Sequence, residues 1–461
     1  MSVISAYIVP HPPLIIPDVG GGQEKIISKT YGSYDRCARE IADSRPDTII
    51  IISPHTTVYA DYFHISPGTS ARGDMSDYRA PDASAETGYD TRLRDVICEE
   101  AEKAGIPAGT LGETQKRLDH ASLIPIWFLH KYYTDHLTIR TGFSGMTPLE
   151  HYRYGKCIAR SVEKTSRRAV VIASGDLSHR LKPEGPYGFA EEGPEFDREI
   201  TDAMADADFL RFLTMPASLS ENAGECGLRS FQIMAGIMDG LSVDQELLSY
   251  EGPFGVGYAV ASFKATGKDP SRCFEKKYIR HKSESLKKIK NNESPIVDLA
   301  RYTLETYVTS GRKPEIPPGT SEELLKKQAG VFVSLKKEGI LRGCIGTIGP
   351  VTDCIAEEVM RNAVSAGTED PRFPPVTSGE LADLVYSVDV LGAPESIASS
   401  NQLNPKRYGV IVSSGRKRGL LLPDLDGIDD PEKQIKIASE KAGILPGEEI
   451  SLERFEVIRH R

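Results

Sequence analysis

Short β-branched runs alternate with longer amphipathic segments over the first 270 residues of the chain. The clearest apolar runs, at 3–9, 48–52 and 169–172, predict strands. Periodic apolar positions at 91–104 and 228–238 predict helices between them. Nearly continuous apolar runs are typical of strands that are covered on both faces of a sheet. We therefore predict an α/β domain built around a parallel or mixed sheet.

The pattern changes between residues 264 and 294, where the chain becomes polar and rich in lysine. A length of 461 residues exceeds what one hydrophobic core supports, so two domains are expected. We place a basic linker at 271–293, between domains at 1–270 and 294–461. A basic run can also bind nucleic acid or an acidic partner, but a solvated linker helix is the interpretation that we favour.

Beyond the linker, helices and strands are arranged differently. Residues 296–307 and 352–366 read as helices, the second started by Thr352 or Asp353 as its cap. Residues 331–335 and 340–345 read as a β-hairpin with a glycine-containing turn, and 384–391, 409–412 and 419–422 as further strands. The pattern predicts a smaller α+β domain with a mostly antiparallel sheet.

Composition narrows the functional classes. Hydrophobic residues at 39% and charged residues at 26% are typical of a globular protein. No segment approaches the ~18 consecutive apolar residues of a membrane span, so we expect no membrane association and a cytoplasmic protein. A net charge of −10 disfavours nucleic-acid binding. The seven scattered cysteines include no CxxC pair, which disfavours a disulfide framework and a zinc ribbon. A small molecule or a protein is the expected partner.

Three predicted strands of the first domain run directly into a histidine. His11 lies in PHPP at 10–13, His55 in SPH at 53–55, and His179 in SGDLSH at 174–179. Ligands of open α/β sheets bind outside the carboxyl ends of the strands. Prolines beside His11 and His55 restrict the backbone there. The placement predicts a metal or catalytic site at that edge.

Two imidazoles need a further ligand to hold a catalytic metal. Glu225, in AGECG before the predicted helix at 228–238, would complete a facial triad for Fe(II). A glutamate at a helix start is also favoured there by the helix dipole alone. Its neighbour Cys226 is the competing ligand, and a thiolate favours zinc or copper. Asp119 and His120 precede an apolar segment, where they could form a helix cap or carry a proton.

These motifs, together with LDHASLIP at 118–125 and GECGLRSF at 224–231, resemble the class III extradiol dioxygenase superfamily, which includes the Memo proteins. The resemblance covers nearly the whole first domain and implies its fold. It also implies an Fe(II) centre of His11, His55 and Glu225. Memo-type relatives have a cysteine where Cys226 lies and lack ring-cleaving activity, so Cys226 with zinc or copper is the alternative.

The same resemblance implies an oxidoreductase that cleaves a catechol- or aminophenol-like ring with O2. His179 would be the acid/base and His120 a substrate contact. Two alternatives stay open: a metal-dependent enzyme that is not an oxygenase, and a metal-binding scaffold whose second domain binds a partner.

LRGCIGT at 341–347 and DPRFPPV at 370–376 make the second domain resemble an AMMECR domain. Fusion of Memo-like and AMMECR units resembles the AmmeMemoRadiSam association, which implies a radical-SAM protein partner, and relatives suggest a homo-oligomer. From the residues alone, we read Cys344 as a small strand residue, and Arg342 and Arg372 as salt-bridge partners in preference to an anion-binding groove.

Overall fold

The computed structural model describes residues 2–425 and 427–461, which divide into two compact units between Lys282 and Ser283. The division falls within helix α10 (Glu275–Asn291), which occupies most of the predicted linker. Among the described residues, no helix combines the length and apolar character needed to cross a bilayer. All seven cysteines are free thiols.

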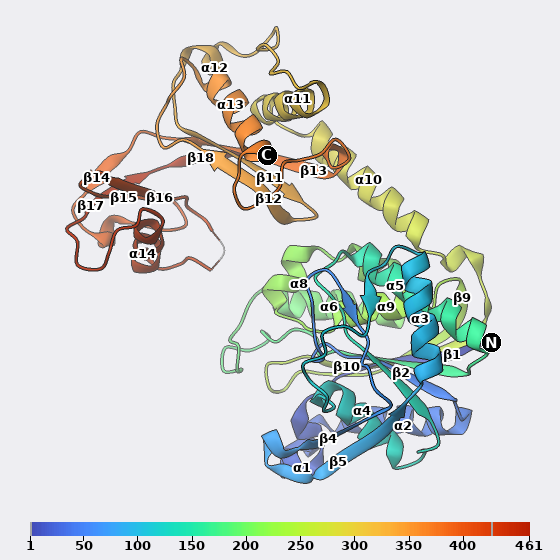
Figure 1. Ribbon diagram of the computed structural model, residues 1–461. Coiled ribbons are helices and arrows are strands. Elements are labelled where there is room, and N and C mark those ends of the chain that lie inside the picture. The colour runs from blue at the N-terminus through green and yellow to red at the C-terminus, as the bar shows by residue number, and fades with distance from the viewer. Residues whose placement is uncertain (1, 426) are drawn as a thin grey trace. The chain divides into compact units, whose positions relative to one another are not determined.

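The first unit contains an eight-stranded mixed sheet (Figure 1). Its central five strands are parallel, and the outer three are joined antiparallel. In spatial order the strands are β4 (Ser70–Met75), β5 (Ala80–Tyr89), β7 (Leu137–Thr141), β2 (Thr48–Ile52), β8 (Ala169–Ser174), β1 (Val3–Val9), β10 (Tyr258–Lys268) and β9 (Leu241–Glu251). The predicted α/β class is confirmed.

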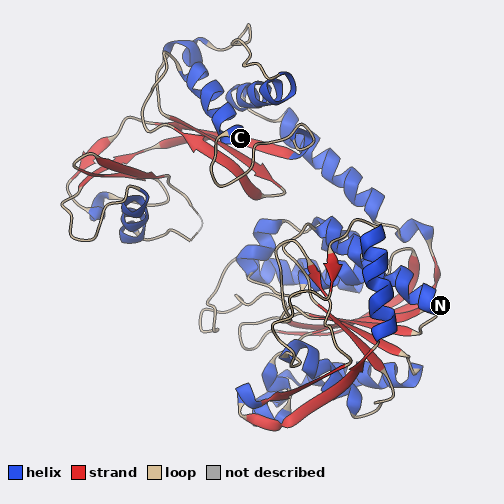
Figure 2. Ribbon diagram, viewed as in Figure 1, coloured by secondary structure: helices blue, strands red, loops and turns tan. Residues whose placement is uncertain are grey.

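Helices cover both faces of this sheet (Figure 2). One core contains residues of α3 (Thr91–Lys103), α5 (Pro148–Thr165), α6 (Glu192–Ala205), α7 (Phe209–Thr214) and α9 (Leu228–Ile237). The other contains residues of α2 (Ser28–Ser44) and α4 (His120–His130). Along β2, Ile50 faces the first core and Ile49 and Ile51 face the second. Burial on both sides explains the unbroken apolar run at 48–52.

Shorter elements complete the unit. They are α1 (Pro17–Gly20), α8 (Ala217–Ala223), the two-stranded pair β3 (Phe63–His64) and β6 (Ala108–Gly109), and several 3-10 turns, of which Ser76–Tyr78 lies between β4 and β5.

The second unit has two antiparallel four-stranded sheets, as the α+β prediction requires. Helices α11 (Pro295–Ser310) and α13 (Ile355–Thr368) pack on the sheet of β12 (Ile340–Gly346), β11 (Val331–Lys337), β13 (Leu384–Leu391) and β18 (Val457–His460). Helix α14 (Pro431–Lys441) packs on the sheet of β14 (Glu395–Ile397), β17 (Ser451–Phe455), β15 (Gly409–Ser414) and β16 (Lys417–Leu421). The short α12 (Glu322–Lys326) contacts α13.

The predicted cap of the helix at 352–366 is wrong. Helix α13 begins at Ile355, and its N-cap residue Cys354 makes no side-chain capping bond. The Thr352 hydroxyl donates instead to Glu358 Oε2 at 2.9 Å. Glu358 also accepts backbone hydrogen bonds from Val351 and Thr352, so a carboxylate inside the helix holds this loop.

The two motifs of the second unit meet at the edge of strand β12. Asp370 Oδ2 accepts a hydrogen bond from the Cys344 backbone N–H at 2.9 Å, and Arg372 Nη2 donates to the Cys344 carbonyl at 3.2 Å. Arg372 is ion-paired with Asp370, and Arg342 with Glu380. Side chains thus satisfy an edge that would otherwise expose unpaired backbone groups. Both arginines are salt-bridge partners, as predicted.

Candidate metal centre

His11 lies just after strand β1 and is buried. Two residues near the end of the neighbouring strand β8 fix its backbone and its ring. The side chain is 2% exposed, its backbone N–H donates to Asp176 Oδ1 at 2.7 Å, and Nδ1 lies 3.0 Å from Ser174 Oγ. Ser174 is the last residue of β8, the neighbouring parallel strand, and Asp176 lies just beyond it. Because Nδ1 is engaged with Ser174, the other nitrogen, Nε2, is free to face the centre of the site.

His55 is held by a network that also starts helix α4. The Ser53 hydroxyl donates to Asp119 Oδ1 at 2.6 Å and accepts from the His55 backbone N–H at 3.2 Å. Asp119 is the N-cap of α4 and accepts from Ser122 N at 3.0 Å, which confirms the cap among the two roles considered for it. The network places His120 beside His55, with ring centroids 4.5 Å apart.

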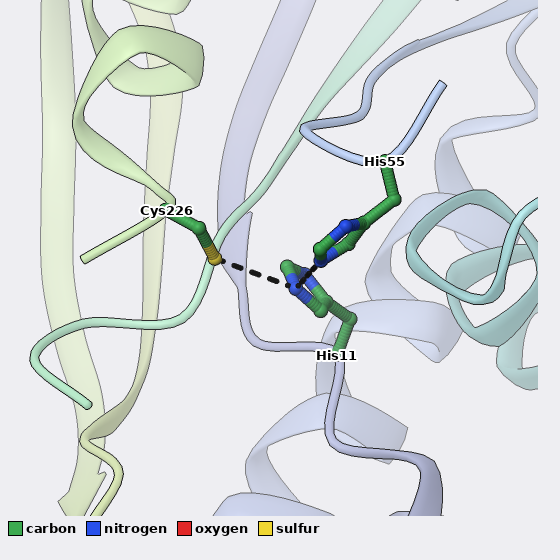
Figure 3. A group of neighbouring side chains, drawn as sticks. All are labelled: His11, His55 and Cys226. Carbon is green, nitrogen blue, oxygen red and sulfur yellow. Dashed lines mark hydrogen bonds between the residues drawn. The ribbon is translucent and has the colours of Figure 1, made fainter. Parts of the chain in front are cut away.

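Three side chains from distant parts of the chain converge here (Figure 3). His11 Nε2 lies 3.1 Å from His55 Nε2 and 3.5 Å from Cys226 Sγ. One ligand atom of each residue lies within 4.8 Å of the others. The Asp176 backbone N–H donates to Cys226 Sγ at 3.3 Å.

The structure does not bring Glu225 into this cluster. Its Oε2 accepts a hydrogen bond from Leu228 N at 2.6 Å, at the start of α9. The first backbone N–H groups of a helix have no partner within the helix, and a carboxylate satisfies them well. Burial raises the pKa of Glu225 to about 7. Of the two candidates for third ligand, the geometry therefore favours Cys226, and Glu225 has the helix-start role that was its alternative.

The two other candidate histidines flank the cluster. The His120 ring centroid lies 5.3 Å from that of His11. His179 stacks on Tyr187 at 5.1 Å, and its Nε2 is buried without a hydrogen-bond partner among the described residues. Burial, assisted by His55, lowers the pKa of both His120 and His179 to about 4, so both rings are neutral at pH 7.

Asp176 is a site residue that was not predicted. Its motif, SGDLSH, was singled out in the sequence, but Asp176 was assigned no role. It is buried, and burial raises its pKa to about 7 although the His11 N–H opposes that shift. It contacts His11 through its side chain and Cys226 through its backbone. Its place in SGDLSH, between a strand end and His179, was the available signal.

Comparison with known proteins assigns both parts of the chain to families. Residues 5–261 match the family model described as the catalytic LigB subunit of aromatic ring-opening dioxygenase. The chain belongs to the LigB family. Residues 297–460 match the AMMECR1 family model, so a LigB domain is followed by an AMMECR1 domain.

Relatives match all or part of this chain. Protein CA_C1420 of Clostridium acetobutylicum is 43% identical over the full length of both chains. A protein of Thermotoga maritima is 47% identical over 171 residues, which is 37% of this chain and 98% of its own. Among solved structures, the uncharacterized protein PH0010 of Pyrococcus horikoshii is 33% identical, covering 36% of this chain and 88% of its own, with a TM-score of 0.34. The uncharacterized protein JW3007 of Escherichia coli K12 is 17% identical, covering 56% and 99%, with a TM-score of 0.38.

The donor set of the LigB domain fits a transition metal. The pKa of His11 lies well below its usual value, mainly because the ring is buried and also because His55 is close. The ring is therefore neutral and offers a lone pair. Ser174 orients that ring, as a partner behind a metal-bound histidine does. Cys226 adds a sulfur that already accepts an N–H bond. Two imidazoles and one thiol can hold an ion while leaving a further position for substrate.

Proposed function

We propose that the LigB domain is a metal-dependent enzyme whose metal is bound by His11, His55 and Cys226. The observation that carries this proposal is the approach of three ligand atoms, each from a different segment, to within 4.8 Å of one another, with His11 buried, Cys226 half-buried and His55 exposed. Two of these residues follow strands β1 and β2, and the third precedes α9, so rigid elements support the site.

The thiol supports zinc or copper in preference to Fe(II). Carboxylate and imidazole donors are typical of the facial triad of non-haem iron, whereas thiolate is the softer ligand. Burial raises the pKa of the Cys226 thiol, and a bound cation would favour its thiolate form. The Asp176 N–H directed at the sulfur supports the same charge.

His179 and His120 are proposed to act on the substrate. His179 is neutral and its buried Nε2 has no partner among the described residues, so it can accept a proton from a bound substrate and return it. His120, beside His55, can hold a polar substrate atom. A bound metal would supply Lewis acidity at a substrate oxygen.

A second candidate function is extradiol ring cleavage with Fe(II) and O2. The family description, which names aromatic ring-opening dioxygenases, favours it and a small aromatic substrate such as a catechol or aminophenol. For the 2-His-1-carboxylate set, Glu225 would have to give up its hydrogen bond to Leu228 N.

Metal analysis separates these candidates. Protein purified without oxygen is reconstituted separately with Zn(II), Cu(I) and Fe(II), and metal per chain is measured for wild type, Cys226→Ser and Glu225→Gln. The proposal expects Cys226→Ser to lose the metal and Glu225→Gln to keep it, because glutamine can still accept at the helix start. Loss with Glu225→Gln alone, together with O2 uptake on catechol, would favour the iron dioxygenase.

A further inference from the structure

Two exposed tyrosines lie against the outer histidines of the metal centre. The Tyr187 ring stacks on His179 with centroids 5.1 Å apart and planes 28° apart. The Tyr78 ring meets His120 edge-on at 5.8 Å. Tyr187 is 63% exposed and Tyr78 38%, so both rings present apolar surface to solvent beside the histidines of the site.

The two rings come from different segments of the LigB domain. Tyr78 ends the 3-10 turn Ser76–Tyr78 between β4 and β5, and Tyr187 lies in the loop between β8 and α6. Tyr78 contacts His120 and Tyr187 contacts His179, the two histidines that flank the metal centre.

The Tyr187 loop is anchored at its base. Leu181 N donates to Gly255 O at 3.1 Å, and Lys182 Nζ donates to Pro253 O at 2.9 Å. Gly185 packs so closely on Gly255 that an added Cβ would lie 3.1 Å from the Gly255 Cα. The ring of Tyr187 is therefore presented to the site by a held turn, which lowers the entropy cost of using it for binding.

We propose that Tyr78 and Tyr187 are specificity-determining residues that hold the ring of an aromatic substrate over His120 and His179. This inference rests on the proposed function of the LigB domain. Aromatic rings prefer stacked or edge-on neighbours, and the outer histidines and the two tyrosines already show both arrangements. A planar ring entering here would cover exposed tyrosine surface, whereas a saturated ring of the same size would lack a π face to offer.

Binding measured without turnover tests the inference. Calorimetric titration of the full chain with catechol and with cis-1,2-cyclohexanediol compares two diols that differ in aromaticity. Each is titrated into metal-free and metal-loaded protein, for wild type, Tyr187→Leu and Tyr78→Leu. Tyr187→Phe keeps the ring, and Phe189→Leu is the matched control, since Phe189 is an exposed aromatic of the same loop, 51% exposed.

The inference expects each tyrosine-to-leucine change to weaken catechol binding about 3- to 10-fold, the range of one aromatic contact, and to leave cyclohexanediol unchanged. Tyr187→Phe and Phe189→Leu should bind catechol as wild type does. The inference is overturned if catechol affinity survives both leucine variants, if both diols weaken equally, or if wild type binds no catechol. Failure of the proposed metal centre is separate, because it shows as metal content unchanged in Cys226→Ser.

Discussion

Ser174 provides the sharpest test of how the metal centre is supported. Its side chain is buried and its hydroxyl lies 3.0 Å from His11 Nδ1. Ser174→Ala removes one atom and leaves the buried His11 Nδ1 without its hydrogen-bond partner, at a cost of about 1–3 kcal/mol. Since the same contact orients a proposed ligand, metal affinity should fall about 10- to 100-fold, which corresponds to roughly 1.4–2.7 kcal/mol.

The chain offers a matched control for this change. Ser230 in α9 is equally buried, but its hydroxyl has no hydrogen-bond partner among the described residues. Ser230→Ala should therefore leave metal affinity unchanged and stability the same or slightly higher. Competition with a chelator measures the affinity, and urea unfolding of the metal-free protein measures the stability. Equal losses in both variants, or a Ser174→Ala affinity within about twofold of wild type, would refute the reasoning.

Three further predictions concern other parts of the structure. Asp119→Ala removes the cap of α4 and the acceptor of the Ser53 hydroxyl, so urea unfolding should show a loss of about 1–3 kcal/mol; an unchanged midpoint would contradict this. Burial raises the pKa of Asp197 to about 7, so the stability that its protonated form contributes is complete below about pH 4 and is lost as pH rises through 7. The free energy of unfolding of Asp197→Asn should therefore rise relative to that of wild type between pH 4 and 8. If the difference between the two proteins stayed constant over this range, the pKa of Asp197 would not be raised in the folded state. Asp370→Ala should speed hydrogen exchange of the Cys344 amide without changing metal content; unchanged exchange would show that the contact does not protect this edge.

Much of the fold follows from local pattern. The predicted strands at 3–9, 48–52 and 384–391 have the bounds of β1, β2 and β13. A strand buried on both faces has a continuous apolar run and one buried on a single face alternates apolar and polar residues, so both can be recognised locally. The start of α13 was predicted wrongly. Glu358, inside the helix, accepts the backbone hydrogen bonds of the preceding loop, so the residue at the cap position itself carries no capping signal. The antiparallel additions β10 and β9 gave no sequence cue to their position at the sheet edge.

Some of the site residues could also be predicted from the sequence, and others could not. Histidines that follow β1, β2 and β8 were recognisable because parallel strands end at one edge of a sheet, which brings their following residues together whatever the rest of the chain does. The choice between Glu225 and Cys226 was beyond local reasoning, since adjacent residues on a turn point in different directions. Only the packed start of α9 decided it: Leu228 N needed an acceptor, Glu225 supplied it, and Cys226 was left facing His11. Tertiary structure also decided the contacts of Asp176, Tyr78 and Tyr187, because each depends on segments far apart in sequence being brought within a few ångströms of one another.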